Sequence, residues 1–375
     1  MSAVGVIIFI GAILASIGLH EFGHFIAAKR FRIKVEQFFI GFGPRVWSVR
    51  RGETEYGIKA LPLGGYVRIA GMNPFEEIAP EDRDRVFKAR KPWQRAIVLG
   101  AGSFTHFVLA AAIITVILSM IGVPDFDRPT TTVESVTATV NGDRSPAAQA
   151  GIVRGDTIVS VAGARVRSWQ HAVDLIKARP GEITEIVFLH EGQTRRAEVR
   201  IADHKPDGTK VGFLGVGPRF DVLKRSVFGA AGESFVQIGR GAWASLLAIK
   251  DLFSPHSLGR LFKVVTGTEQ RLPTDPATVV GIGQQAGGLA RTGDFAGLFY
   301  LIAGFNVFIG VANLLPLPPL DGGHLAVLAY EKIRGRDVDM RRLLPVTAAV
   351  ISIFGSLFLL LLYLDIVKPL PGIPG

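Results

Sequence analysis

The sequence predicts an α-helical polytopic membrane protein with four transmembrane helices, a membrane-associated β-hairpin loop and an extracytoplasmic β-rich domain. Hydrophobic residues make up 48% of the 375 positions, and the mean hydropathy is positive. A hydrocarbon core of ~30 Å is crossed by about 20 helical residues. Four stretches without Asp, Glu, Lys or Arg are long enough to do so: Met1–His20, Ala96–Pro124, Phe295–Leu320 and Leu343–Leu364.

Basic residues predict how these four helices are oriented. Fifteen Lys or Arg lie between Lys29 and Arg95, and five more lie in the short link Glu331–Arg342. Basic residues near the ends of spans are retained in the cytoplasm. Both basic links are therefore expected on the cytoplasmic side, with both termini and the region Asp125–Asp294 on the other side.

Composition also excludes some classes of protein. There is no cysteine, which excludes disulfides and thiolate metal sites. The net charge of +10 is mostly the topology signal, and no nucleic-acid motif accompanies it, so no nucleic acid partner is expected. The first apolar stretch lacks a basic leading region and a small-residue cleavage site, so we interpret it as a transmembrane helix rather than a signal peptide.

The first span contains a candidate metal site, because residues 20–24 read His-Glu-Phe-Gly-His. Positions i and i+4 share one face of a helix, so His20 and His24 can bind one ion. Glu21 lies beside them, where it can take a proton from an attacking water. The alternative is a pair of histidines that faces a polar cavity. Ionisable groups within a membrane span are costly and usually functional, which favours the metal.

A catalytic zinc ion needs a third protein ligand, and Asp321 is the candidate. It interrupts an apolar stretch at the end of the third span. His20 and His24 lie nine and five residues before Lys29, and Asp321 lies ten residues before Glu331. At 1.5 Å per residue, this spacing predicts a similar depth, ~8–15 Å from the basic links, for all three side chains.

The segment before Asp321 contains three prolines, and the middle of a helix does not tolerate them. Non-helical backbone at membrane depth is expected only where it lines a cavity or is packed in protein. Asn313 then either holds an unwound substrate strand or an oxyanion, or makes a helix–helix hydrogen bond. His324 is either a further metal ligand or a hydrogen-bonding neighbour of the site.

These motifs together resemble the site-2 protease family of intramembrane zinc metalloproteases, in its bacterial regulator of sigma-E protease-like branch. The first span carries His20-Glu21-x-x-His24, and the third carries Asn313-x-x-Pro316-x-x-x-Leu320-Asp321-Gly322. Gly41-Phe-Gly-Pro44 and Pro62-Leu-Gly-Gly-Tyr66-Val67 are similar to the membrane-associated β-hairpin loop of the family. The resemblance extends over essentially the whole chain.

The resemblance implies a Zn²⁺ cofactor bound by His20, His24 and Asp321, with Glu21 as the general base. Further functional positions that it implies are listed here: Asn313, Pro316 and Pro318 for substrate binding, and Asn306 as a weaker match. One position departs from the family. The second span usually begins Gly-Pro-x-x-Asn, whereas this chain reads Gly102-Ser-Phe-Thr-His106, so His106 stands where a polar contact near the site is expected.

The outer region contains a β-rich segment over residues 128–203. Two stretches rich in β-branched residues flank Ser145-Pro-Ala-Ala-Gln-Ala-Gly151 and Gly155-Asp156. This arrangement resembles a single PDZ domain, whose free sheet edge accepts a peptide strand; a plain β-domain spacer is the alternative. Val227–Leu247 is apolar, but Glu233 and Arg240 favour a helix on the outer leaflet over a fifth span.

The predicted organisation follows from these elements. It comprises transmembrane helix 1 (1–30), a cytoplasmic β-loop (31–95), transmembrane helix 2 (96–123), the PDZ domain (128–203), a region of amphipathic helices (204–294), transmembrane helix 3 (295–330) and transmembrane helix 4 (343–367). The predicted location is a bacterial inner membrane, with the active site near the cytoplasmic face.

By resemblance, the predicted activity is hydrolysis of a peptide bond in or near the transmembrane segment of a single-span protein. An anti-sigma factor already cut outside the membrane by a site-1 protease is the expected substrate. Two alternatives remain open. One is a non-catalytic membrane scaffold or transporter with a structural metal, against which the presence of Glu21 speaks. The other is a recruiting role for the PDZ domain beside a vestigial site.

Overall fold

The computed structural model describes residues 3–371 except 74–75, 141, 205–209 and 337. The chain forms two compact units. The first contains residues 1–120 and 225–374 and holds the long apolar helices, whereas the second contains residues 121–224 and is mostly β-sheet. Residues 205–209, which the sequence analysis assigns to the region after the β-domain, lie outside the described part of the chain.

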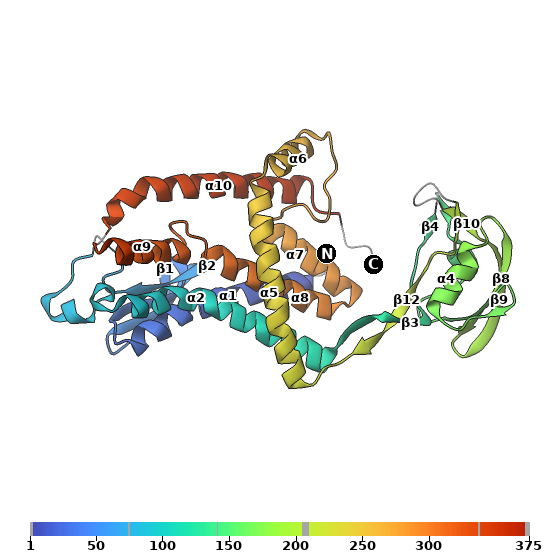
Figure 1. The fold of residues 1–375 in the computed structure, drawn as a ribbon, viewed down its shortest axis with the longest axis horizontal. Coiled ribbons are helices and arrows are strands. Elements are labelled where there is room, and N and C mark those ends of the chain that lie inside the picture. Colours follow the sequence, from blue (N-terminus) through green and yellow to red (C-terminus); the bar gives the residue numbers. More distant parts are fainter. Residues whose placement is uncertain (1–2, 74–75, 141, 205–209, 337, 372–375) are drawn as a thin grey trace. The chain divides into compact units, whose positions relative to one another are not determined.

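Four helices in the described part of the chain are long and apolar enough to cross a membrane. They are α1 (Ala3–Arg30), α2 (Pro92–Val116, extended by a π-helical turn Ile117–Ile121), α8 (Phe295–Asn313) and α10 (Leu344–Val367, preceded by a 3₁₀ turn Met340–Leu343). Figure 1 shows that their axes are roughly aligned. This confirms the four apolar helices that the sequence predicts.

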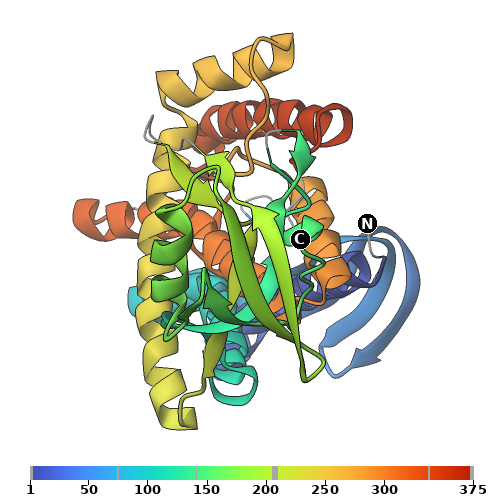
Figure 2. The same cartoon turned by 90° about the vertical axis from the view of Figure 1, so that its right-hand side faces the viewer.

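Helix α5 (Val227–Leu252) runs across the other helices and is not a fifth candidate span (Figures 1 and 2). It packs on α2 and α8 through small side chains, and Gly241 allows it to approach Val307. Large apolar side chains such as Phe228, Phe235 and Trp243 are exposed on its outer side. Two shorter helices follow, α6 (Pro255–Thr266) and α7 (Val279–Thr292).

The predicted hairpin is present as antiparallel strands β1 (Val35–Arg51) and β2 (Thr54–Ile69). Its turn is attached to the end of α1, because Glu53 accepts hydrogen bonds from Lys29 and Arg85 at 2.6 Å each. Two 3₁₀ turns, Pro80–Arg85 and Phe87–Ala89, connect the hairpin to α2. The hairpin is therefore fixed beside the helix that carries the His-Glu-x-x-His motif.

The third span is interrupted, as its prolines predict. Helix α8 ends at Asn313, and a new helix, α9 (Asp321–Arg334), begins at Asp321. The intervening residues are non-helical and include the Pro318–Pro319 peptide bond, which is cis. The range 295–330 predicted for transmembrane helix 3 is thus two helices, and Asp321 is the first residue of the second.

The second unit is built on a sheet with strand order β12-β3-β6-β8-β9, with β7 paired to β6. Its elements are β3 (Val123–Val136), β4 (Thr139–Val140), β5 (Asp143–Arg144), α3 (Pro146–Gln149), β6 (Thr157–Val161), β7 (Ala164–Arg165), α4 (Trp169–Lys177), β8 (Ile183–His190), β9 (Gln193–Arg200), β10 (Ala202–His204), β11 (Val211–Phe213) and β12 (Val216–Leu223). Strand β12 forms one edge of the sheet and pairs only with β3 among the described strands.

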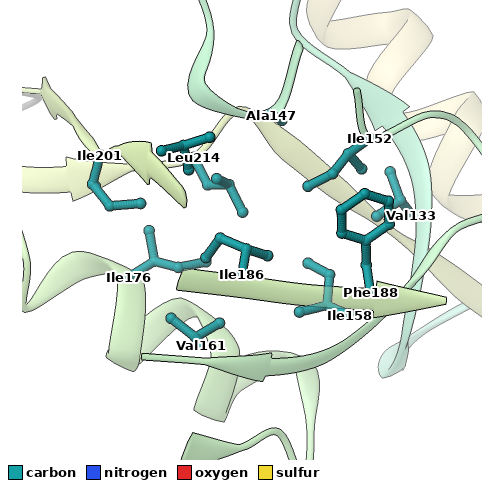
Figure 3. Packing of buried hydrophobic residues seen from close by; sticks show 11 residues of the cluster. Val133, Ala147, Ile152, Ile158, Val161, Ile176, Ile186, Phe188, Ile201 and Leu214 are labelled. Atoms are coloured by element: carbon teal, nitrogen blue, oxygen red, sulfur yellow. The ribbon is translucent and has the colours of Figure 1, made fainter. Parts of the chain in front are cut away.

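The core of this unit is a single cluster of aliphatic side chains and Phe188 (Figure 3). Leu214, which lies beyond the predicted end of the domain at residue 203, is buried in it at 2% exposure. The predicted range 128–203 is therefore shorter than the unit. Strand β12 lies outside the predicted range, because two short strands and polar loops separate it from β9 in the sequence.

The far end of α10 is attached by a buried ion pair to the segment that precedes α7. Asp365 is fully buried and accepts hydrogen bonds from the Arg271 guanidinium at 2.7 Å and from the Thr278 backbone and side chain at 2.8 and 2.5 Å. Gly281 is required beside it, because a Cβ there would lie 2.6 Å from Asp365 Oδ1. Burial of this carboxylate is tolerated because each oxygen is paired.

We expect Asp365→Ala to destabilise the protein by about 3–5 kcal/mol, because it leaves the Arg271 guanidinium buried without its counter-charge. Thermal unfolding of the full chain in detergent checks this. The matched control is the double variant Asp365→Leu with Arg271→Met, which removes both charges and should cost much less. Equal losses in the single and double variants would contradict the interpretation.

Candidate metal and catalytic site

Three predicted side chains meet between α1 and the start of α9. The Nε2 atoms of His20 and His24 are 3.2 Å apart, and each lies 3.4 Å from Asp321 Oδ2. These are the only three His, Cys, Asp or Glu residues in the described part of the chain whose ligand atoms cluster in this way. Residues separated by almost 300 positions thus converge as the spacing predicts.

The triangle has the dimensions of one face of a tetrahedral zinc site. Zinc bonds to histidine nitrogen and carboxylate oxygen are about 2.0–2.1 Å long, which places adjacent tetrahedral ligands about 3.3 Å apart. Asp321 Oδ2 is buried without a hydrogen-bond donor among the described residues. A buried carboxylate oxygen without a donor is costly. The three side chains therefore fit a metal ion and leave its fourth position open.

Helix α2 orients both imidazoles. The carbonyl of Val98 accepts a hydrogen bond from His24 Nδ1 at 2.7 Å, which leaves the Nε2 lone pair of His24 for a metal. One turn further along α2, the backbone at Gly102 lies against both rings. A Cβ at Gly102 would lie 2.3 Å from His24 Nε2 and 2.7 Å from His20 Cε1. Only glycine allows α2 to approach the two rings this closely.

Two further glycines, Gly322 and Gly323, bring Asp321 to the imidazoles. A Cβ on Gly322 would lie 2.2 Å from the carbonyl group of Leu314, and one on Gly323 would lie 2.5 Å from the Pro318 nitrogen. The non-helical segment after α8 therefore folds back onto the first turn of α9. This close backbone packing fixes the position of Asp321 at the start of that helix.

The hairpin contacts the predicted general base. A Cβ on Gly65 of β2 would lie 3.1 Å from Glu21 Cγ. The absence of a side chain at Gly65 therefore lets β2 approach Glu21 closely. Glu21 is held between the metal-ligand group and an extended strand.

The structure places the other predicted residues around this group rather than within it. Asn313 ends α8, and Pro316 and Pro318 lie in the non-helical segment that follows. His324 is one turn beyond Asp321 but is not part of the metal-ligand group. The contact of Gly102 with both imidazoles is not predicted from the sequence.

Residues 8–362 match the model of peptidase family M50. The chain belongs to this family. The M50 protein is therefore a site-2-type zinc metalloprotease, as the resemblance implied.

Named relatives cover nearly the whole M50 chain. It is 34% identical to zinc metalloprotease Rip1 of Mycobacterium tuberculosis over 99% of both chains, and 31% identical to metalloprotease MmpA of Caulobacter vibrioides over 85% and 84% of the two chains. Zinc metalloprotease RasP of Geobacillus kaustophilus is 27% identical over 90% of this chain and 91% of its own. A PDZ domain of an SdrC-like protein from Listeria monocytogenes aligns with 24% of this chain and 87% of its own, at 24% identity and a TM-score of 0.20.

We expect Gly102→Ala to lower zinc affinity about 10–100-fold, because the added methyl group would displace both imidazoles. Metal analysis of the purified protein after equilibration with a competing chelator measures this. Gly100→Ala is the matched control on the same helix, since a Cβ there meets no atom within 4 Å. Equal zinc affinity in the two variants would show that α2 does not hold the imidazoles.

Proposed function

We propose that this M50 protein hydrolyses a peptide bond in or near the transmembrane segment of a single-span membrane protein. The proposal assigns zinc binding to His20, His24 and Asp321, and the general-base role to Glu21. The observation that carries it is the ligand triangle with edges of 3.2, 3.4 and 3.4 Å beside a glutamate. A purely structural zinc site would use four protein ligands and would need no base.

When bound, a zinc ion supplies Lewis-acid activation of water and of the scissile carbonyl. The residues of the chain supply the rest. His20 and His24 present Nε2, and the Val98 carbonyl keeps the proton of His24 on Nδ1. Glu21 takes the proton of the attacking water and delivers it to the leaving amine. Strand β2 packs against the Glu21 side chain at Gly65.

The substrate must be unwound before it is cut, because a helix hides its carbonyl groups. Strand β2 reaches the site at Gly65, where a side-chain-free backbone lies against Glu21. Backbone groups of a strand can pair with an extended substrate segment. We assign Asn313, Pro316 and Pro318 to the opposite side of this segment, because they form the non-helical stretch that leads to Asp321.

The basic residues of the hairpin connection and of the link after α9 support a cytoplasmic position for this end of the helices. The β-rich unit is then extracytoplasmic, and its free edge strand β12 supports a PDZ-type domain that limits access to bulky substrates. The substrate class we favour is an anti-sigma factor type of single-span protein that a site-1 protease has already shortened, in a bacterial inner membrane.

Two variants test the assignment with separate readouts. We expect Glu21→Gln to keep one zinc per chain but to lose at least 10²–10⁴-fold in cleavage rate, because the base is removed and the ligands are not. Asp321→Ala should lose zinc as well as activity. Cleavage of a membrane substrate is followed by blotting and zinc by metal analysis. Unchanged cleavage by Glu21→Gln would overturn the proteolytic mechanism, and retained zinc in Asp321→Ala would overturn the ligand set.

A further inference from the structure

His106 is a buried imidazole next to the metal-ligand group that the proposed reaction does not use. It lies on α2, is 2% exposed, and its ring centroid is 5.1 Å from that of His20. It is not one of the three clustered ligands. A histidine held among apolar helices without a metal needs another partner, since an unpaired polar group there is costly.

That partner is Asn306 on α8, and the hydrogen bonds fix the direction of the contact. Asn306 Nδ2 donates to the carbonyl of Ile302 at 2.9 Å, one turn back on the same helix. Its Oδ1 is therefore the acceptor that lies 2.9 Å from His106 Nδ1, so Nδ1 carries the proton. Asn306 is itself 1% exposed, so the whole contact is buried.

The contact joins α2, which orients the imidazoles, to α8, which leads to Asp321. The helices are close here, because a Cβ on Gly310 would lie 3.3 Å from the Cβ of His106. Two apolar helix surfaces can shift along each other with little change in energy, whereas a buried hydrogen bond forms at only one relative position of the two helices. The His106–Asn306 bond therefore defines the depth of α8 relative to α2.

We propose that His106 is a positioning residue of the metal site, which sets through Asn306 the depth at which α8 delivers Asp321 to the two imidazoles. This inference rests on the proposed zinc ligands. The positioning role requires only the N–H group at the Nδ1 position of His106. Asparagine places its amide nitrogen at nearly the same point as histidine Nδ1, so it can replace His106 in this role, and leucine cannot.

The test is a double-mutant cycle on zinc affinity in the purified full chain, measured by chelator competition. We expect His106→Leu and Asn306→Leu each to weaken zinc binding about tenfold, and the double variant to bind no more weakly than the weaker single variant. His106→Asn should stay within about threefold of wild type. The absorption spectrum of the Co²⁺-loaded protein should change in the leucine variants and not in His106→Asn.

The control on the same helix is Ser119→Ala, whose hydroxyl bonds only to the Thr115 carbonyl of its own helix; it should not change zinc affinity. Thermal unfolding identifies any variant that fails to fold, and His106→Asn then decides. Wild-type affinity in His106→Leu, or multiplied effects in the double variant, would overturn the inference. Complete zinc loss in both His106→Leu and His106→Asn would also overturn it, because His106 would then be a ligand.

The proposed function fails in a different way. If His20→Ala and Asp321→Ala kept zinc, the ligand set itself would be wrong. If those variants lose zinc while His106→Leu binds it normally, only the positioning role is wrong.

Discussion

The fold depends on holding two imidazoles and one carboxylate within 3.4 Å of each other, although they come from distant parts of the chain. Two close backbone contacts at glycine positions make this possible. Gly102 allows α2 to press against the imidazoles, and Gly322 allows the segment after α8 to fold onto α9. Both contacts leave no room for a Cβ atom, so each fixes the distance between the two packed segments.

Several buried polar groups of the apolar helices are paired, whereas, within the described residues, Asp321 Oδ2 is not. His24 pairs with a backbone carbonyl, His106 with Asn306, and Asp365 with Arg271. The first two pairs each join two helices, and the third joins α10 to the segment before α7, so the same bonds that satisfy buried groups also fix how these elements lie. Asp321 Oδ2 lacks a hydrogen-bond donor among the described residues. It is the group whose natural partner is the metal ion.

Much of this arrangement could be predicted from the sequence. The stretches without charged residues predict the four apolar helices, and the prolines after Asn313 predict the break in the third predicted span. The meeting of His20, His24 and Asp321 could be predicted because the number of residues between each of them and the nearest basic link gives a similar depth for all three. The hairpin could be expected from the resemblance of Gly41-Phe-Gly-Pro44 and Pro62-Leu-Gly-Gly-Tyr66-Val67 to the loop of the family.

Other features depend on contacts that one sequence does not encode locally. The role of Gly102 arises only when α1 and α2 are packed, because a glycine in a helix carries no sign of what it touches. Strand β12 belongs to the sheet of the second unit because Leu214 and its neighbours close the core there, although short strands and loops separate it from β9. The Ile302 carbonyl that sets the direction of the His106–Asn306 bond lies on the same helix as Asn306, but the bond itself forms only when α2 packs on α8.

X-ray absorption spectroscopy at the zinc edge tests the central claim most directly, because the outer-shell scattering of imidazole rings counts histidine ligands. The account predicts two imidazoles per zinc, light-atom distances of about 2.0–2.1 Å, and an unchanged imidazole count in the His106→Asn and Glu21→Gln variants. A spectrum with three imidazoles, or with fewer than two, would contradict a site built from His20, His24 and Asp321.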